Sequence, residues 1–187
     1  MMINIPKVGK RYAKALFSFA LEQNELEQVK DDMSLIHNTI EQSRELQLLL
    51  KNPLLPHKKK KSLIKAIFES HVGKTVLTYL MIILQRNREV YIRDIATQFV
   101  VFYKEYKNIK TAYLATAAEV KDDIRQTIVQ TLKEQLNADI ELVEELQQEL
   151  IGGIVLKVDD QEIDMSLKKR LNDLAREFQY NLYQGKI

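Results

Sequence analysis

Residues 150–171 read LIGGIVLKVDDQEIDMSLKKRL, and this stretch decides how the C-terminal part of the chain is interpreted. Its apolar run IVLKV is typical of a half-buried strand, and DDQE supplies a turn before a second short strand, IDM. Gly152 and Gly153 stand at the entry of the first strand, in a chain with only 5 Gly. Glycine weakens a strand through chain entropy and lost packing, so the pair indicates a bend or a close backbone approach. Ser166 is expected to cap the helix that follows.

The residues around this stretch predict a small α+β domain over residues 109–187. Residues 111–120 are rich in small and β-favouring residues, and residues 140–145 alternate, so both are expected to be strands. Between them an apolar residue recurs at every fourth position from Ile124 to Leu136, which predicts a helix that Asn137 ends. The closing helix is expected to carry an apolar stripe on one face, made of Leu167, Leu171, Leu174, Phe178 and Leu182.

Residues 1–108 predict a bundle of six helices, so the fold class is mainly α with an α+β C-terminal domain. An unbroken apolar stripe from Leu26 to Ile40 follows helical spacing, which a helix buries on one side and a strand does not. The prolines of NPLLP, residues 52–56, end one helix and allow the next to begin. Residues 76–84 are apolar on nearly every side, which indicates the most buried helix or one with a docking face.

Composition and motifs argue against an enzyme, a cofactor or a metal site. The chain has no Cys, which excludes disulfides, thiolate metal sites and cysteine nucleophiles and favours a reducing compartment. The three histidines show no ligand spacing; His37 is expected to be half-buried, and His57 and His71 solvated. Neither a GxGxxG nor a GxxxxGK[ST] pattern occurs. No run reaches the roughly 20 apolar residues of a membrane helix, and no targeting segment is evident, so a cytoplasmic protein without direct membrane insertion is expected.

The uneven distribution of charge along the chain leaves an alternative function open. Through Lys110 the chain has 19 Lys+Arg and 11 Asp+Glu, against 9 and 15 in the remainder. The basic run from His57 to Lys61 suggests a nucleic-acid-binding helical protein, because clustered lysines neutralise phosphates. Aromatic residues that would stack on bases are not interleaved with the run, so a solvated helix face is the favoured interpretation.

Three stretches carry a family resemblance. RYAKALFSFA at residues 11–20, NPLLP at 52–56 and above all GGIVLKVDDQEIDMSLKKRL at 152–171 resemble the delta subunit of the bacterial F-type ATP synthase, the counterpart of the mitochondrial oligomycin-sensitivity-conferring protein. The order of six helices and a smaller mixed domain matches over essentially the whole chain. One departure is that the family often has Gly shortly after the Ser of its D-x-S motif, where this chain has Lys168 and Lys169.

The resemblance implies a non-catalytic subunit of the peripheral stalk, on the cytoplasmic face of the bacterial plasma membrane. In that family the N-terminal bundle binds helical N-terminal segments of the alpha subunits, and the C-terminal domain holds the end of the b subunit. The subunit keeps the catalytic head from turning with the rotor, so that proton transport drives ATP synthesis. Its C-terminal signature corresponds here to Gly152, Gly153, Asp164 and Ser166.

Two sets of partner contacts follow as hypotheses. The alpha segment is expected in a groove between the first and fifth helices, lined by Tyr12, Ala15, Phe19, Val76, Leu80 and Ile83. The alternative is that most of these six fill the bundle core. Leu174, Phe178 and Leu182 are candidate contacts of the b subunit, or core residues of the C-terminal domain.

Overall fold

The computed structural model describes the backbone of residues 6–182, and their side chains except those of residues 174, 175 and 177–182. The chain divides into two compact units, residues 1–106 and residues 107–187. Each unit has its own hydrophobic core, and each is described by itself.

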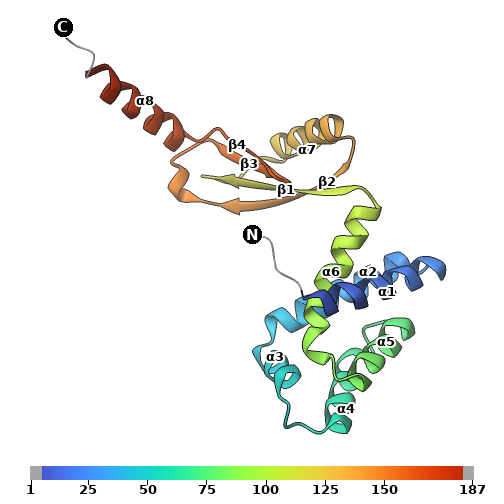
Figure 1. The fold of residues 1–187 in the computed structure, drawn as a ribbon. Helices are drawn as coiled ribbons and strands as arrows, with labels where there is room; N and C mark the ends of the chain where they lie inside the picture. Colours follow the sequence, from blue (N-terminus) through green and yellow to red (C-terminus); the bar gives the residue numbers. More distant parts are fainter. Residues whose placement is uncertain (1–5, 183–187) are drawn as a thin grey trace. The chain divides into compact units, whose positions relative to one another are not determined.

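In its described residues, 6–106, the N-terminal unit has six α-helices and one short 3₁₀ turn, which confirms the expected helical bundle (Figure 1). Asn24 and Asn87 adopt positive φ values of 58° and 56° where the chain leaves a helix. Asparagine tolerates this left-handed conformation better than most residues, so it ends helices well. The elements are α1 (Lys7–Glu22), α2 (Leu26–Gln42), α3 (Arg44–Lys51), α4 (His57–Phe68), α5 (Lys74–Gln85), η1 (Glu89–Tyr91) and α6 (Ile92–Tyr106).

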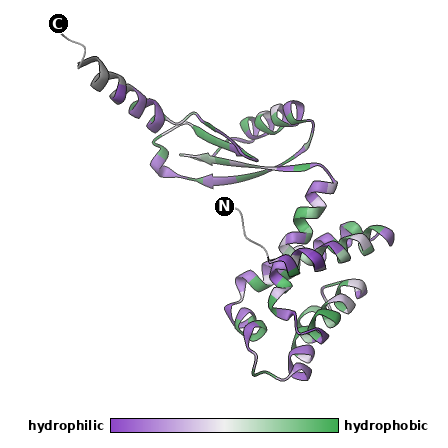
Figure 2. Cartoon of the chain, viewed as in Figure 1, coloured by the Kyte–Doolittle hydropathy of each residue, from purple (hydrophilic) through white to green (hydrophobic). Residues whose placement is uncertain are grey.

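The core of this unit forms where amphipathic faces of the helices meet. The apolar stripe of α2 is buried from Leu26 to Ile40. Phe17 of α1 packs against Phe99 and Phe102 of α6, with ring centroids 5.8 and 6.2 Å apart. In Figure 2 hydrophobic and hydrophilic residues alternate along the helices, as amphipathic elements require.

Over residues 107–182 the C-terminal unit has a four-stranded sheet and two α-helices, which confirms the α+β expectation. The strand order is β2-β1-β3-β4; β1 and β2 are parallel, and the other pairs are antiparallel. The first strand ends at Thr116, so residues 117–120 lie outside it, contrary to the prediction. The elements are β1 (Ile109–Thr116), α7 (Asp122–Leu136), β2 (Asp139–Leu146), η2 (Gln148–Leu150), β3 (Ile154–Val158), β4 (Gln161–Asp164) and α8 (Leu167–Leu182).

The core of the sheet lies beneath α7. Ala112, Val158 and Leu132 are buried together, and Ile128 and Leu142 pack against them. The link from β1 through α7 to β2 is the crossover that two neighbouring parallel strands require. Asn137 ends α7 in the left-handed conformation, at φ 47°, as its position after the periodic run predicts.

Candidate functional site: a groove between α1 and α5

An apolar groove opens between α1 and α5 of the N-terminal unit. It encloses about 460 Å³. Phe19 and Ile82 remain 47% and 45% exposed on its walls. Its lining residues are Ala15, Leu16, Phe19, Lys74, Thr75, Thr78, Tyr79 and Ile82. An apolar side chain or the apolar face of a helix could pack in this groove. Its lining residues include no His, Asp or Glu that could act as an acid, a base or a metal ligand.

Hydrogen bonds between elements fix the walls of the groove. The hydroxyl of Tyr79 donates to the carbonyl oxygen of Tyr12 over 2.8 Å, which ties α5 to α1. Burial, followed by the nearby Tyr12, raises the pKa of Tyr79, so this hydroxyl stays protonated as the donor. The Thr75 hydroxyl donates to Oε2 of Glu25 over 2.7 Å. The groove is therefore held by polar contacts at its middle and at one end.

The beginning of α5 is also fastened to α2. The backbone N–H of Gly73 donates to Oδ2 of Asp32 over 2.8 Å, so a carboxylate satisfies an N–H group at the start of the helix. Burial raises the pKa of Asp32, and the hydrogen bond from Gly73 opposes that shift. A Cβ at Gly73 would lie 3.0 Å from Nε2 of Gln28, so this approach leaves little room for a side chain.

Only some of the six residues that the sequence assigned to the groove line it in the structure. Ala15 and Phe19 line it, while the half-buried Tyr12 packs against the core and contributes its carbonyl oxygen to the bond with Tyr79. Three of the six, Val76, Leu80 and Ile83, are 0% exposed and belong to the core. Their assignment to the groove wall needs correction, because these positions form the face of α5 that points into the bundle.

The face of α5 that lines the groove consists of residues the sequence reasoning missed. The face begins at Thr75 and continues three, four and seven positions later with Thr78, Tyr79 and Ile82, which is the spacing of one side of a helix. Two threonines in an otherwise apolar helix were the available signal, since polar residues favour the side that is not buried against the bundle.

The C-terminal signature forms a junction between β3 and α8. Gly153 has φ 81°, and a Cβ there would lie 2.3 Å from the carbonyl oxygen of Met165, so only glycine fits. The carbonyl oxygen of Gly152 accepts the N–H of Leu167 over 2.9 Å. Backbone therefore packs directly on backbone where α8 begins.

Two side chains complete this junction. Asp164 Oδ1 accepts the N–H of Ser166, and Ser166 Oγ accepts the N–H of Lys169, over 2.9 and 3.2 Å. Ser166 is thus the expected cap of the closing helix. Hydrogen bonds from Ser166, followed by the charge of Lys169, lower the pKa of the Asp164 carboxyl. The junction gives α8 a fixed starting point.

The candidate b-subunit contacts lie on α8, and their side chains fall outside the described residues. These are Leu174, Phe178 and Leu182. In the first two turns of α8 the preceding residues of the same stripe, Leu167 and Leu171, are 44% and 54% exposed. The described beginning of the stripe is therefore open to solvent within this unit.

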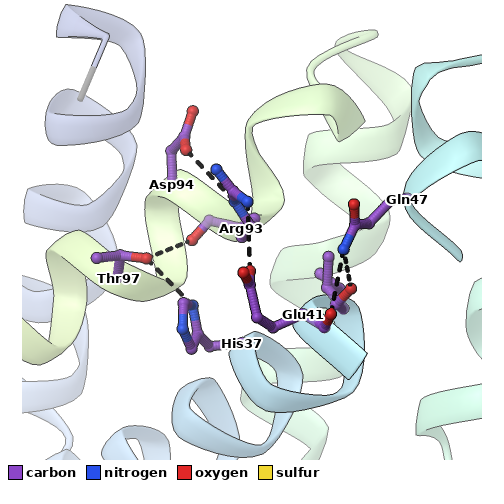
Figure 3. A network of polar contacts seen from close by, with 7 residues as sticks. His37, Glu41, Gln47, Arg93, Asp94 and Thr97 are labelled. Carbon is purple, nitrogen blue, oxygen red and sulfur yellow. Dashed lines mark hydrogen bonds and ion pairs between the residues drawn. The ribbon is translucent and has the colours of Figure 1, made fainter. Parts of the chain in front are cut away.

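The histidines occupy structural positions. His37 is half-buried on α2, as predicted, and its Nδ1 lies 3.1 Å from Oγ1 of Thr97 on α6 (Figure 3). Beside it Arg93 of α6 pairs with Glu41 of α2 over 3.2 Å. These contacts join α2 to α6. His57 and His71 are exposed, as expected.

Among the described residues, no group of three or more His, Cys, Asp or Glu is placed to hold a metal ion. Within that part of the chain, no helix is both long and apolar enough to cross a bilayer. The basic run at the start of α4 is interrupted, because Lys60 is buried in an ion pair with Glu89.

Comparison with known proteins identifies the family. The family model described as ATP synthase delta (OSCP) subunit matches residues 8–178. The chain belongs to the ATP synthase delta (OSCP) subunit family. A delta subunit from Cytophaga hutchinsonii is 30% identical over 172 residues, covering 92% of this chain and 94% of that protein. One from Desulforamulus reducens is 34% identical over 164 residues, covering 88% and 91%.

A solved structure shares the fold. A chain in the cryo-EM structure of the Toxoplasma gondii mitochondrial ATP synthase hexamer superposes with a TM-score of 0.70 at 22% identity. The match covers 93% of this chain and 98% of that chain. As a member of the delta family, the chain is a non-catalytic component of the peripheral stalk of F-type ATP synthase. This confirms the expected function, and membership of this family replaces the nucleic-acid alternative.

Proposed function

We propose that this delta-family chain joins the catalytic head to the b-subunit stalk through one contact in each unit. The observation that carries the proposal is the groove between α1 and α5, whose lining is largely apolar and whose walls are held by hydrogen bonds. An amphipathic helix laid in a hydrophobic groove is a recurrent mode of recognition. The N-terminal segment of an alpha subunit is the proposed occupant, held by Ala15 and Phe19 from one side and by Tyr79 and Ile82 from the other.

The b subunit is proposed to bind the apolar stripe of α8. Leu167 and Leu171 are exposed, and the sequence continues the same stripe with Leu174, Phe178 and Leu182. An apolar stripe whose described residues, Leu167 and Leu171, are exposed suits a partner made of helices, because apolar stripes of neighbouring helices bury one another. The junction at Gly153 and Ser166 supports this interpretation, since it fixes where the helix starts.

Two contacts on one chain give a firm attachment without a very tight single site. Once one unit is bound, binding of the other becomes intramolecular, and avidity exceeds the single affinities by about 10² to 10⁴ where the geometry permits. The chain then works as a non-catalytic clamp at the periphery of the membrane-bound complex. For a bacterial source, that position lies on the cytoplasmic face of the plasma membrane.

The groove is tested by titrating the full chain with a labelled peptide from the alpha N-terminus and following fluorescence anisotropy. Ala15→Asp places a charge on an apolar wall and should weaken binding at least tenfold. Lys59→Glu is the matched control, because this exposed lysine of α4 does not line the groove, and it should leave binding within about twofold. Absence of saturable binding by the unaltered chain would remove the groove proposal.

The b contact needs its own experiment. Leu171→Asp should reduce co-purification of the chain with the b subunit, because it puts a charge on the exposed apolar stripe of α8. Lys168→Asp is the control, since it changes charge on a neighbouring exposed position outside that stripe. Equal losses for the two variants, with both remaining folded by circular dichroism, would contradict the assignment of the stripe.

A further inference from the structure

The groove has a defined direction, because α1 and α5 run in opposite senses along it. Thr75, at the start of α5, bonds Glu25 just beyond the end of α1. One turn later Tyr79 bonds the carbonyl oxygen of Tyr12, in the first half of α1. The last turn of α5 therefore lies toward the first turn of α1. Opposed helices oppose their macrodipoles, so side-chain charges set the electrical polarity of the groove.

One end of the groove is basic. Arg11 lies four residues before Ala15 on the stripe of α1 that continues to Phe19, and it is exposed. Arg86 lies four residues after Ile82 at the end of α5, and it is also exposed. No ion pair within the described part of the chain involves either arginine. The sequence positions of the two arginines thus continue the two walls beyond the apolar lining.

The other end carries more negative charge. Glu22 follows Phe19 by three positions on α1 and is exposed. Glu25 and Asp32 contribute the carboxylates that bond Thr75 and Gly73, while Lys74 is the cation in the lining. Asp32 is buried, so a helix lying along the groove meets two arginines at one end, and at the other end Glu22 and Glu25 together with Lys74.

We infer that the groove selects an amphipathic helix whose acidic residues gather at one end, and that Arg11 and Arg86 bind this acidic end and so fix the helix direction. Arginine suits the task because its planar guanidinium pairs with carboxylates bidentately. The apolar lining supplies affinity, and the two arginines decide which of two opposite orientations is occupied. This inference rests on the proposed function, since it specifies the chemistry and the direction of the helix proposed for the groove.

Orientation can be measured because the chain has no Cys. Gln85→Cys places one thiol at the basic end and Gln23→Cys places one at the opposite end, without changing any charge. The probes are two capped 18-residue model helices that share the apolar stripe of the alpha segment. One carries three Glu in its first turn, the other carries them in its last turn, and each has one Cys at its acidic end.

Both model helices should form disulfides with the Gln85→Cys variant at least tenfold faster than with the Gln23→Cys variant. Moving the acidic cluster should thus turn the helix around in the groove. The inference is overturned if the preferred end is the same sequence end in both helices, or if the two variants react equally. It is also overturned if the alpha segment binds and neither model helix does.

Charge reversal provides the second readout. The double variant Arg11→Glu with Arg86→Glu should weaken binding of each model helix by about fivefold, as expected for two exposed ion pairs. Lys59→Glu is the matched control and should have no such effect. Failure of the natural alpha segment to bind would refute the proposed function itself. Saturable binding of that segment, together with an orientation that ignores charge, would refute only the role of the two arginines.

Discussion

Removing one partner of the buried ion pair between α4 and η1 should destabilise the N-terminal unit strongly. Lys60 Nζ and Glu89 Oε1 are 2.6 Å apart, and the two side chains are only 3% and 6% exposed. At this distance the attraction is about 6 kcal/mol for an effective dielectric constant of about 20. Desolvating each ion costs several kcal/mol, so the attraction and the desolvation cost nearly cancel and the pair adds little net stability. Lys60→Met leaves a buried carboxylate without its cation, which typically costs about 3–5 kcal/mol.

The loss should be largely recovered when both charges are removed. Glu89 Oε2 has no hydrogen-bond partner in the described structure, so the carboxylate is only partly satisfied even in the unaltered chain. The double variant Lys60→Met with Glu89→Met should therefore unfold within about 1.5 kcal/mol of the unaltered protein. Lys65→Met, which breaks an exposed pair with Glu69, is the control and should cost less than about 0.5 kcal/mol.

Native-state hydrogen exchange at the amides of Ile36 and Phe99 measures the opening free energy of this unit, since both residues are fully buried in its core. In urea the same loss should lower the unfolding midpoint by about 1.5–2.5 M, for an m value of about 2 kcal/mol/M. A loss below about 1 kcal/mol for Lys60→Met would refute the reasoning. So would a double variant as unstable as the single one.

Three further predictions concern the junction at the start of α8. Gly153→Ala should destabilise the C-terminal unit by about 1–3 kcal/mol, because a side chain at φ 81° is strained and its Cβ would meet the Met165 carbonyl. Exchange of the Ala112 amide reports the loss, and full protection would contradict it. Ser166→Ala should cost about 1 kcal/mol of helix stability, seen as faster exchange at the Lys169 amide. The pKa of the Asp164 carboxyl is lowered, so its contribution is present above the unfolded value of about 3.9 and is lost as pH falls through the folded value. Lowering the pH should therefore reduce the protection of the Ser166 amide against hydrogen exchange in the unaltered chain, and Asp164→Asn should remove that pH dependence.

Periodicity predicted most of the fold, because burial on one side of a helix leaves a repeating signal in the sequence. The stripe from Leu26 to Ile40 became the buried face of α2, and the run from Ile124 to Leu136 became α7. Gly153 likewise signalled a conformation that side chains do not adopt. These features are local, so residues close together in the sequence are enough to predict them.

The residues of α5 that line the groove required the structure, because α5 is apolar on nearly every side. Apart from its two threonines, its sequence does not distinguish the face that points into the bundle, with Leu80, from the face that lines the groove, with Ile82. The burial of Lys60 was equally hidden. Its partner Glu89 is 29 residues away, and nothing in the run of four lysines marks the third of them, Lys60, as the buried one.

The central claim is that the chain acts by holding the catalytic head to the stalk through a continuous link between its two units. Proton-driven ATP synthesis in reconstituted vesicles tests this claim most directly, using a chain with a protease site inserted at residues 107–108. The uncut chain should support synthesis. Cutting it should abolish synthesis while each fragment stays bound to its own partner. Undiminished synthesis after complete cutting would contradict the account.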